Sequence, residues 1–168
     1  MQSPEIKTKT ANSVTSRTMQ NYVQRIRDLK LYPLNLGMIC SGNFQSTQHI
    51  IQFFIKIKDL PNYVTILGGG SGYVGDTTVK KIALELELGY REYNPVHTPY
   101  NVYSAFPQYR YSKAFNTGNF MTRYNELVKK SDKLIIFQDK DCSDIFINKI
   151  ITQLEKQKIL VPYVILNE

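Results

Sequence analysis

A glycine-rich run between residues 68 and 76 carries the residue types best suited to hold an anion. The segment 64–67, Val-Thr-Ile-Leu, favours a strand and leads directly into five glycines within eight positions. A helical pattern begins shortly afterwards, at residue 77 or 78, and continues to Leu88. A strand that ends in glycines and reopens as a helix presents backbone N–H groups beside the positive end of the helix dipole. The pattern predicts a phosphate or other anion site, and a glycine-rich surface loop without a ligand is the alternative. The predicted contacts are Gly69, Gly70, Ser71 and Gly72.

Short apolar runs alternate with helical patterns along the rest of the chain, and these elements must position the glycine turn. Strands are expected over residues 36–40, 63–67, 90–93, 134–137 and 160–166. Helices are expected over residues 49–57, 77–88, 120–130 and 145–157. Strands that alternate with helices indicate βαβ units and therefore a parallel sheet covered on both faces. The predicted class is α/β, a Rossmann-like three-layer sandwich with a mainly parallel central sheet.

Three parts of the chain are expected from these patterns. Residues 1–18 are polar and predict a flexible arm, residues 19–32 an amphipathic N-terminal helix, and residues 33–168 a single Rossmann-like domain. The stretch 94–116 interrupts the pattern with three prolines and several aromatics, which either stack on a ligand or pack the loop onto the domain. The aromatics considered are Tyr100, Tyr103, Phe106, Tyr109 and Tyr111.

Polar residues gather at the predicted carboxyl ends of the strands, where ligands bind in such folds. Ser41, Gly42 and Asn43 follow the first predicted strand of the domain, and Ser143 follows the fourth. Asp76 at the end of the glycine run could contact a ligand, hold the loop or cap the helix. Arg123 and Asn125 lie on the helix after the aromatic stretch, where a guanidinium suits bidentate phosphate binding and a solvated surface arginine is the alternative.

Composition narrows the classes of partner. The chain has 21 Lys and Arg against 14 Asp and Glu, a net charge of +7, but its basic residues are scattered and form no nucleic-acid stripe. Two cysteines and two histidines without metal-ligand spacing predict no metal site, no disulfide framework and no cofactor. No stretch reaches the length of a membrane span, so we expect a cytoplasmic protein.

Several short motifs resemble SLOG-type Rossmannoid domains over roughly residues 36–166. The runs that carry the resemblance are Ser41-Gly42-Asn43, Gly69-Gly70-Ser71-Gly72-Tyr73-Val74-Gly75-Asp76, Arg123-Tyr124-Asn125 with Val128 and Ser131-Asp132, and Leu134-Ile135-Ile136-Phe137. The second is similar to the group's strand–Gly-Gly-Ala–x–Gly-x-Asp–helix pattern, with two additional residues before Gly75. The resemblance implies a Rossmann-like fold that binds nucleotides or nucleotide-derived ligands. It also implies a homo-oligomer, for which the helix at 19–31 could supply an interface.

The wider group includes LOG phosphoribohydrolases, DprA-type DNA-processing proteins and ligand sensors of antiviral defence. The LOG enzymes carry a catalytic Glu after a Pro-Gly-Gly-x-Gly-Thr run, whereas this chain has Asp76 after its glycines and an acidic run, 139–144, after the fourth strand. The first hypothesis is therefore a nucleotide-binding module. The alternative is a nucleotide N-glycosidase that uses Asp76 or the Asp139–Asp144 carboxylates, of which Asp139 is the catalytic candidate. A DNA-associated protein ranks last.

Overall fold

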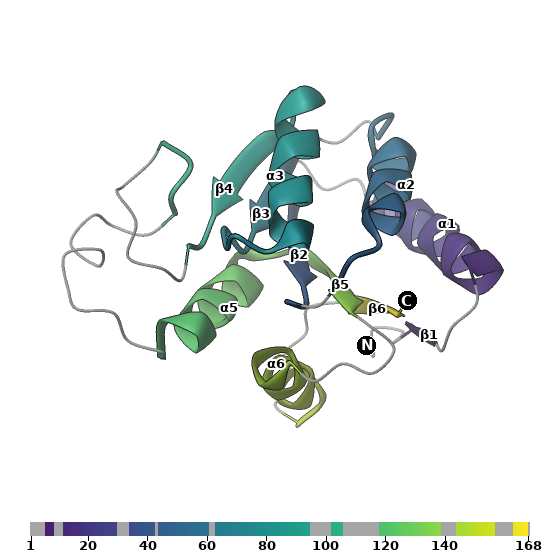
Figure 1. Cartoon of the computed structure of the whole chain (residues 1–168). Coiled ribbons are helices and arrows are strands. Elements are labelled where there is room, and N and C mark those ends of the chain that lie inside the picture. Colours follow the sequence, from purple (N-terminus) through teal and green to yellow (C-terminus); the bar gives the residue numbers. More distant parts are fainter. Residues whose placement is uncertain are drawn as a thin grey trace.

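Buried apolar runs pair side by side into one six-stranded sheet (Figure 1). The computed structural model describes residues 6–8, 12–29, 34–42, 44–60, 63–94, 102–105, 118–138, 144–156 and 163–167. The strands are β1 (Ile6–Thr8), β2 (Leu34–Cys40), β3 (Val64–Gly68), β4 (Gly89–Glu92), β5 (Lys133–Gln138) and β6 (Tyr163–Asn167). The helices are α1 (Asn12–Leu29), α2 (Thr47–Ile57), α3 (Val74–Glu85), α5 (Gly118–Lys130) and α6 (Ile145–Lys156).

The sheet has the order β1-β6-β5-β2-β3-β4, and every ladder in it is parallel. From β2 the chain adds β3 and β4 on one side, then returns to add β5 and β6 on the other. The order β4-β3-β2-β5-β6 is that of a doubly wound Rossmann-like sheet, 3-2-1-4-5, with its switch point between β2 and β5. The predicted α/β class and the Rossmann-like sandwich are confirmed.

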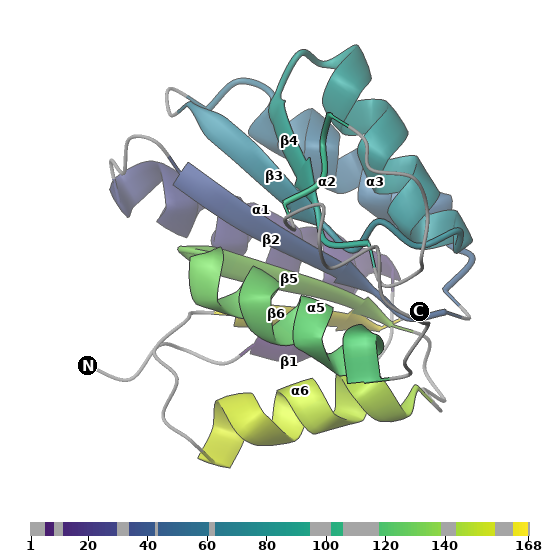
Figure 2. The same ribbon diagram turned by 90° about the vertical axis from the view of Figure 1, so that its left-hand side faces the viewer.

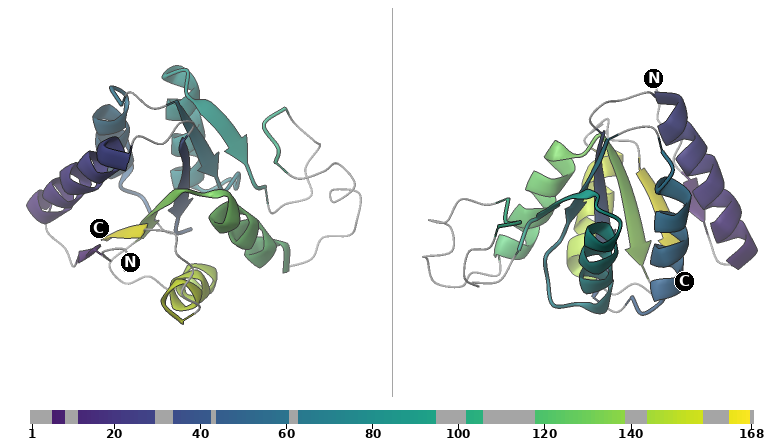
Figure 3. Two further views of the ribbon diagram at one scale, coloured as in Figure 1. Left: turned by 180° about the vertical axis from the view of Figure 1, so that it is seen from behind. Right: turned by 90° about the horizontal axis from the view of Figure 1, so that it is seen from above.

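Two layers of helices cover the sheet. Helices α1, α2 and α3 pack on one face, and α5 and α6 pack on the other (Figure 2). Seen from above, α1 and α2 lie on one side of the strands and α5 on the other (Figure 3). Apolar cores on both faces explain why β2 is buried along nearly its whole length rather than at alternate positions. The described residues contain no helix with the length and apolar character needed to cross a membrane.

The N-terminal segment differs from the prediction of a flexible arm over residues 1–18. Residues 6–8 form β1, which pairs with β6 in the register Ile6 to Val164, and α1 begins at Asn12. The prediction was wrong because the partner of this short strand comes from the other end of the chain. The polar start of α1 also carries no apolar period that could reveal a helix.

Helix α1 belongs to the core rather than standing outside it. Met19 and Ile26 are fully buried, and the Tyr22 hydroxyl donates a hydrogen bond to the Leu134 carbonyl oxygen on β5 at 2.8 Å. The apolar face of α1 therefore does not offer the exposed interface that was predicted for it. Oligomerisation itself stays a prediction.

Helix α3 also begins earlier than the sequence indicates. It starts at Val74, so that Gly75 and Asp76 lie in its first turn instead of in the preceding loop. A Cβ at Gly75 would lie 2.5 Å from the Cβ of Cys40, so the absence of a side chain lets α3 approach the end of β2. Tertiary packing thus overrides the weak helix propensity of glycine at this position.

Candidate functional site

The turn between β3 and α3 requires glycine at two positions. Gly70 has φ +67°, and a Cβ there would lie 3.1 Å from both the Glu92 Cβ and the Asn94 Cα. A Cβ at Gly69 would lie 2.6 Å from Asp76 Oδ2. Gly72 is different, because among the described residues no atom beyond its two chain neighbours lies within 4 Å of the position of its Cβ. The turn is therefore tightly constrained on its inner side and open at Gly72.

Asp76 closes the turn from the first turn of α3. Its side chain is buried, and Oδ2 accepts hydrogen bonds from the Ser71 backbone N–H at 3.2 Å and from the Ser71 hydroxyl. The Ser71 Oγ in turn accepts the Tyr73 N–H at 3.3 Å. Of the three roles predicted for Asp76, the structure shows that of holding the loop.

Arg123 reaches the same turn from α5, on the opposite face of the sheet. Its Nη1 donates to the Gly69 carbonyl oxygen at 2.9 Å and lies 3.4 Å from Asp76 Oδ2. Its Nη2 donates to the Tyr124 hydroxyl at 2.6 Å, and the side chain is only 1% exposed. Arg123 is thus neither a solvated surface residue nor a guanidinium open to a phosphate in this conformation. It positions the glycine turn by linking the two helical layers across the carboxyl edge of the sheet.

Burial dominates the electrostatics beneath the turn. It raises the pKa of Asp76 above the usual range of an aspartate, although the Arg123 guanidinium and the Ser71 hydrogen bonds act in the opposite direction. The pKa of the neighbouring Cys40 thiol is also well above its ordinary value, mainly through burial. Cys40 is 1% exposed and is therefore a core residue.

A second turn, after β2, lies at the switch point. The Ser41 N–H donates to the Phe137 carbonyl oxygen at 2.8 Å, which continues the pairing of β2 with β5. The Gly42 N–H donates to Asp144 Oδ2 at 3.3 Å. Asp144 Oδ1 accepts the N–H groups of Phe146 at 3.0 Å and Ile147 at 3.1 Å, so Asp144 caps α6. Within the described part of the chain, the buried Ser41 hydroxyl has no hydrogen-bond partner.

Glu92, at the end of β4, is a buried carboxylate that sequence reasoning missed. Its Oε2 lies 3.3 Å from Lys80 Nζ and accepts the Tyr90 hydroxyl at 3.1 Å. Lys80 Nζ also lies 5.0 Å from the centre of the Tyr103 ring, and Tyr103 packs edge-on against Tyr90. The signal available in the sequence was the position of Glu92 at a strand end, but its partners come from α3 and from residues 102–105.

These contacts settle the role of Tyr103. The Glu92 N–H donates to the Tyr103 carbonyl oxygen at 2.9 Å, and the Ala105 N–H donates to the Glu92 carbonyl oxygen at 2.8 Å. Residues 102–105 therefore lie along the edge of the sheet beside β4, and Tyr103 packs the segment onto the domain. This was one of the two predicted roles for the aromatic stretch, whose other named members lie outside the described residues.

The remaining predicted residues are placed only in part. Asn125 is half-buried on α5, two positions beyond Arg123. Three predicted residues lie outside the described residues: Asn43, Asp139 and Ser143. Within the described ranges, no group of three or more His, Cys, Asp or Glu side chains is arranged to hold a metal ion.

Comparison with known proteins identified no relative of this chain. No family model matches the chain, and no curated protein or solved structure shows a significant match. The resemblance to SLOG domains therefore stays a prediction that rests on the motifs. The parallel sheet defines the class of fold, an α/β Rossmann-like sandwich.

Proposed function

We propose that this chain binds a nucleotide or a nucleotide-derived anion, with a phosphate on the turn formed by Gly69, Gly70, Ser71 and Gly72. The observation that carries the proposal is the buried Arg123–Asp76–Ser71 network, which fixes the turn from below while Gly72 stays open. A turn whose shape is already fixed loses little conformational entropy when it binds a ligand.

The electrostatics of the turn favour an anion. The turn leads into α3, a helix of 12 residues whose N-terminus carries the positive end of its dipole. The Arg123 guanidinium offsets the charge of Asp76, so that this carboxylate does not cancel the field of the helix. The net charge of +7 adds a long-range attraction for anions. The motif resemblance to SLOG domains points to the same class of ligand.

Binding is better supported than N-glycosidic hydrolysis. Asp76 is 3% exposed, and its Oδ2 is occupied by Ser71 and Arg123. Both oxygens of Asp144 accept backbone N–H groups. A general acid or base must come within hydrogen-bond reach of the reacting group. These two carboxylates instead hold the turns together.

The test exploits the open position at Gly72. A Gly72→Asp variant introduces a negative charge at a position where the described residues, apart from the two chain neighbours, leave room for a Cβ, and Gly72→Asn is the matched neutral control. The wild type is first screened by thermal shift against mononucleotides, NAD, ADP-ribose and cyclic nucleotides. A ligand at 100 times its Kd stabilises a protein by about 2.7 kcal/mol.

The best ligand is then titrated into both variants by calorimetry. We expect Gly72→Asn to bind within a few-fold of the wild type, and Gly72→Asp to bind at least about tenfold more weakly, a loss of about 1.4 kcal/mol. Chromatography of the recovered ligand should show it intact, whereas released base would indicate a glycosidase. Equal affinity of the two variants, or no stabilisation by any compound in the screen, would refute the phosphate site.

A further inference from the structure

Tyr73 links the two turns at the carboxyl edge of the sheet. It follows Gly72 and directly precedes α3, and its ring covers Gly42 in the turn after β2. A Cβ at Gly42 would lie 3.2 Å from Tyr73 Cζ, 3.3 Å from Cε2 and 3.6 Å from Cε1. These three ring carbons, and not the hydroxyl oxygen, are the nearest atoms. The Cβ position therefore lies over the face of the ring rather than beyond its edge.

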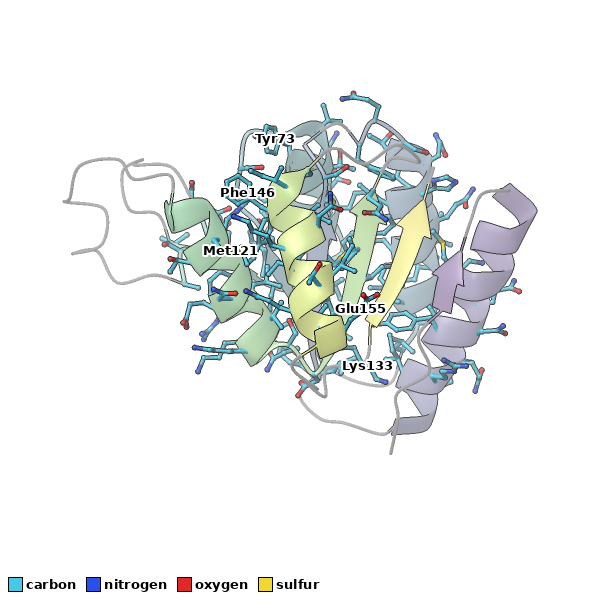
Figure 4. All side chains as sticks on the ribbon, turned by 90° about the horizontal axis from the view of Figure 1, so that it is seen from below. Tyr73, Met121, Lys133, Phe146 and Glu155 are labelled. Carbon is cyan, nitrogen blue, oxygen red and sulfur yellow. The ribbon has the colours of Figure 1, made fainter. Side chains whose placement is uncertain are left out.

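Tyr73 is partly exposed to solvent. The residue is 41% exposed, and the neighbouring Val74 is 42% exposed. The ring therefore lies against Gly42 and still leaves part of the residue's surface accessible. Figure 4 labels Tyr73 on the same side of the molecule as Phe146, in the first turn of α6. A partly exposed aromatic ring is a surface on which a planar group can stack.

We infer that Tyr73 is the stacking residue for the nucleobase of a nucleotide whose phosphate lies on the glycine turn. The inference rests on the proposed function and adds to it the recognition of a heteroaromatic base. Tyr73 is adjacent in the chain to the phosphate-binding residues, so one ligand can reach both groups across its ribose. Tyr103, the described aromatic of the 94–116 stretch that was predicted to stack on the base, is already packed against Tyr90 and Lys80.

The turn under the ring contains a second feature of a ligand site. Ser41 directly precedes Gly42, is 1% exposed, and has a hydroxyl without a hydrogen-bond partner among the described residues. Buried polar groups are almost always hydrogen-bonded in folded proteins, and the described residues leave this hydroxyl available to a further partner. The edge of a base, directly or through a water molecule, offers the donors and acceptors that would satisfy it.

The test separates the base from the phosphate. AMP, GMP, CMP, UMP and ribose 5-phosphate are titrated into the wild type, Tyr73→Ala and Tyr73→Phe. We expect Tyr73→Ala to weaken the best nucleotide about 5- to 150-fold, the fold-change that corresponds to stacking of one base on an aromatic side chain. Ribose 5-phosphate should bind to it as it binds to the wild type, because its phosphate contacts are left intact. Tyr73→Phe keeps the ring and should behave as the wild type.

A fluorescent variant gives an independent measurement. The chain contains no tryptophan, so Tyr73→Trp places a single reporter at the proposed stacking position. A stacked nucleotide should quench its emission, whereas ribose 5-phosphate should not. Circular dichroism of each variant confirms that it is folded.

Three results would overturn the inference. If Tyr73→Ala binds nucleotides with the affinity of the wild type, or if its affinities for nucleotide and for ribose 5-phosphate fall equally, the ring does not contact the base. If the Trp variant binds nucleotide without quenching, the base lies elsewhere. In each of these cases phosphate binding persists in the wild type, and the proposed function stands. Failure of the wild type to bind any of the five compounds would instead refute the proposed function.

Discussion

Replacement of Arg123 by methionine would leave the Asp76 carboxylate buried without its guanidinium partner. The two side chains are 1% and 2% exposed, and Arg123 Nη1 lies 3.4 Å from Asp76 Oδ2. Removal of one partner of a buried ion pair typically costs about 3–5 kcal/mol, because the remaining charge is desolvated and uncompensated. The Arg123 hydrogen bond to the Gly69 carbonyl oxygen is lost as well, so we expect a value in the upper part of this range.

The reciprocal variant and the double variant complete a thermodynamic cycle. Asp76→Asn leaves the Arg123 guanidinium buried without a counter-ion, but it should cost less than Arg123→Met, because burial already favours the neutral form of Asp76. The double variant removes both charges, so its cost should be smaller than the sum of the single costs. For a chain of this length each kcal/mol corresponds to about 2–4 °C in Tm. Arg123→Met should therefore melt about 6–20 °C below the wild type.

The assay is urea unfolding followed by circular dichroism, with Glu85→Gln as the control. Glu85 pairs with Lys81 at 3.9 Å, but the two side chains are 60% and 73% exposed. Loss of such a surface pair should change stability by less than about 0.5 kcal/mol. A cost below about 1 kcal/mol for Arg123→Met, or a double variant whose cost equals the sum of the single costs, would show that Arg123 and Asp76 do not hold the turn together.

Two further predictions concern pH and the second turn. Because burial raises the pKa of Asp76, the folded state binds this proton more readily than the unfolded chain does. The stability from this group is complete below about pH 4, the ordinary range of aspartate, and is lost as pH rises through the folded-state pKa. Asp76→Asn should therefore show a shallower fall in the free energy of unfolding between about pH 4 and 7, and slopes identical to the wild type would contradict this sign. Asp144→Ala removes the N-cap of α6 and the tie to Gly42, and should cost about 1–2 kcal/mol in chemical denaturation. Asp144→Asn keeps the capping oxygen and should lose less, so equal losses would contradict a capping role.

The local sequence pattern was sufficient to predict features that depend on residues of a single strand, helix or turn. The buried strands of a parallel sheet are nearly continuous apolar runs, so β2, β3 and β5 could be located from their residues alone. The cap at Asp144 and the core position of Cys40 follow from their immediate neighbours in the chain. The strand–glycine–helix order likewise placed the turn at the carboxyl edge of the sheet.

The local sequence pattern could not predict features that depend on a contact with residues distant in the chain. Ile6 to Thr8 becomes a strand only because β6 is there to pair with it. Glu92 is buried because Lys80 from α3 and the segment 102–105 pack around the end of β4. Neither of these contacts produces a hydrophobic periodicity that could be recognised in the local sequence.

The class of fold, the alternation of strands and helices from β2 onward, and the glycines of the turn can be read from adjacent residues, because each depends on their burial pattern or backbone freedom. What those residues do at the site depends on contacts between distant parts of the folded chain. Arg123 meets Gly69 and Asp76 across 54 and 47 positions of the chain, and it does so over the edge of the sheet from the opposite layer. Arg123 was expected to bind a phosphate, but its guanidinium is buried in this contact. Because a buried guanidinium must be satisfied by the groups packed around it, Arg123 positions the turn instead.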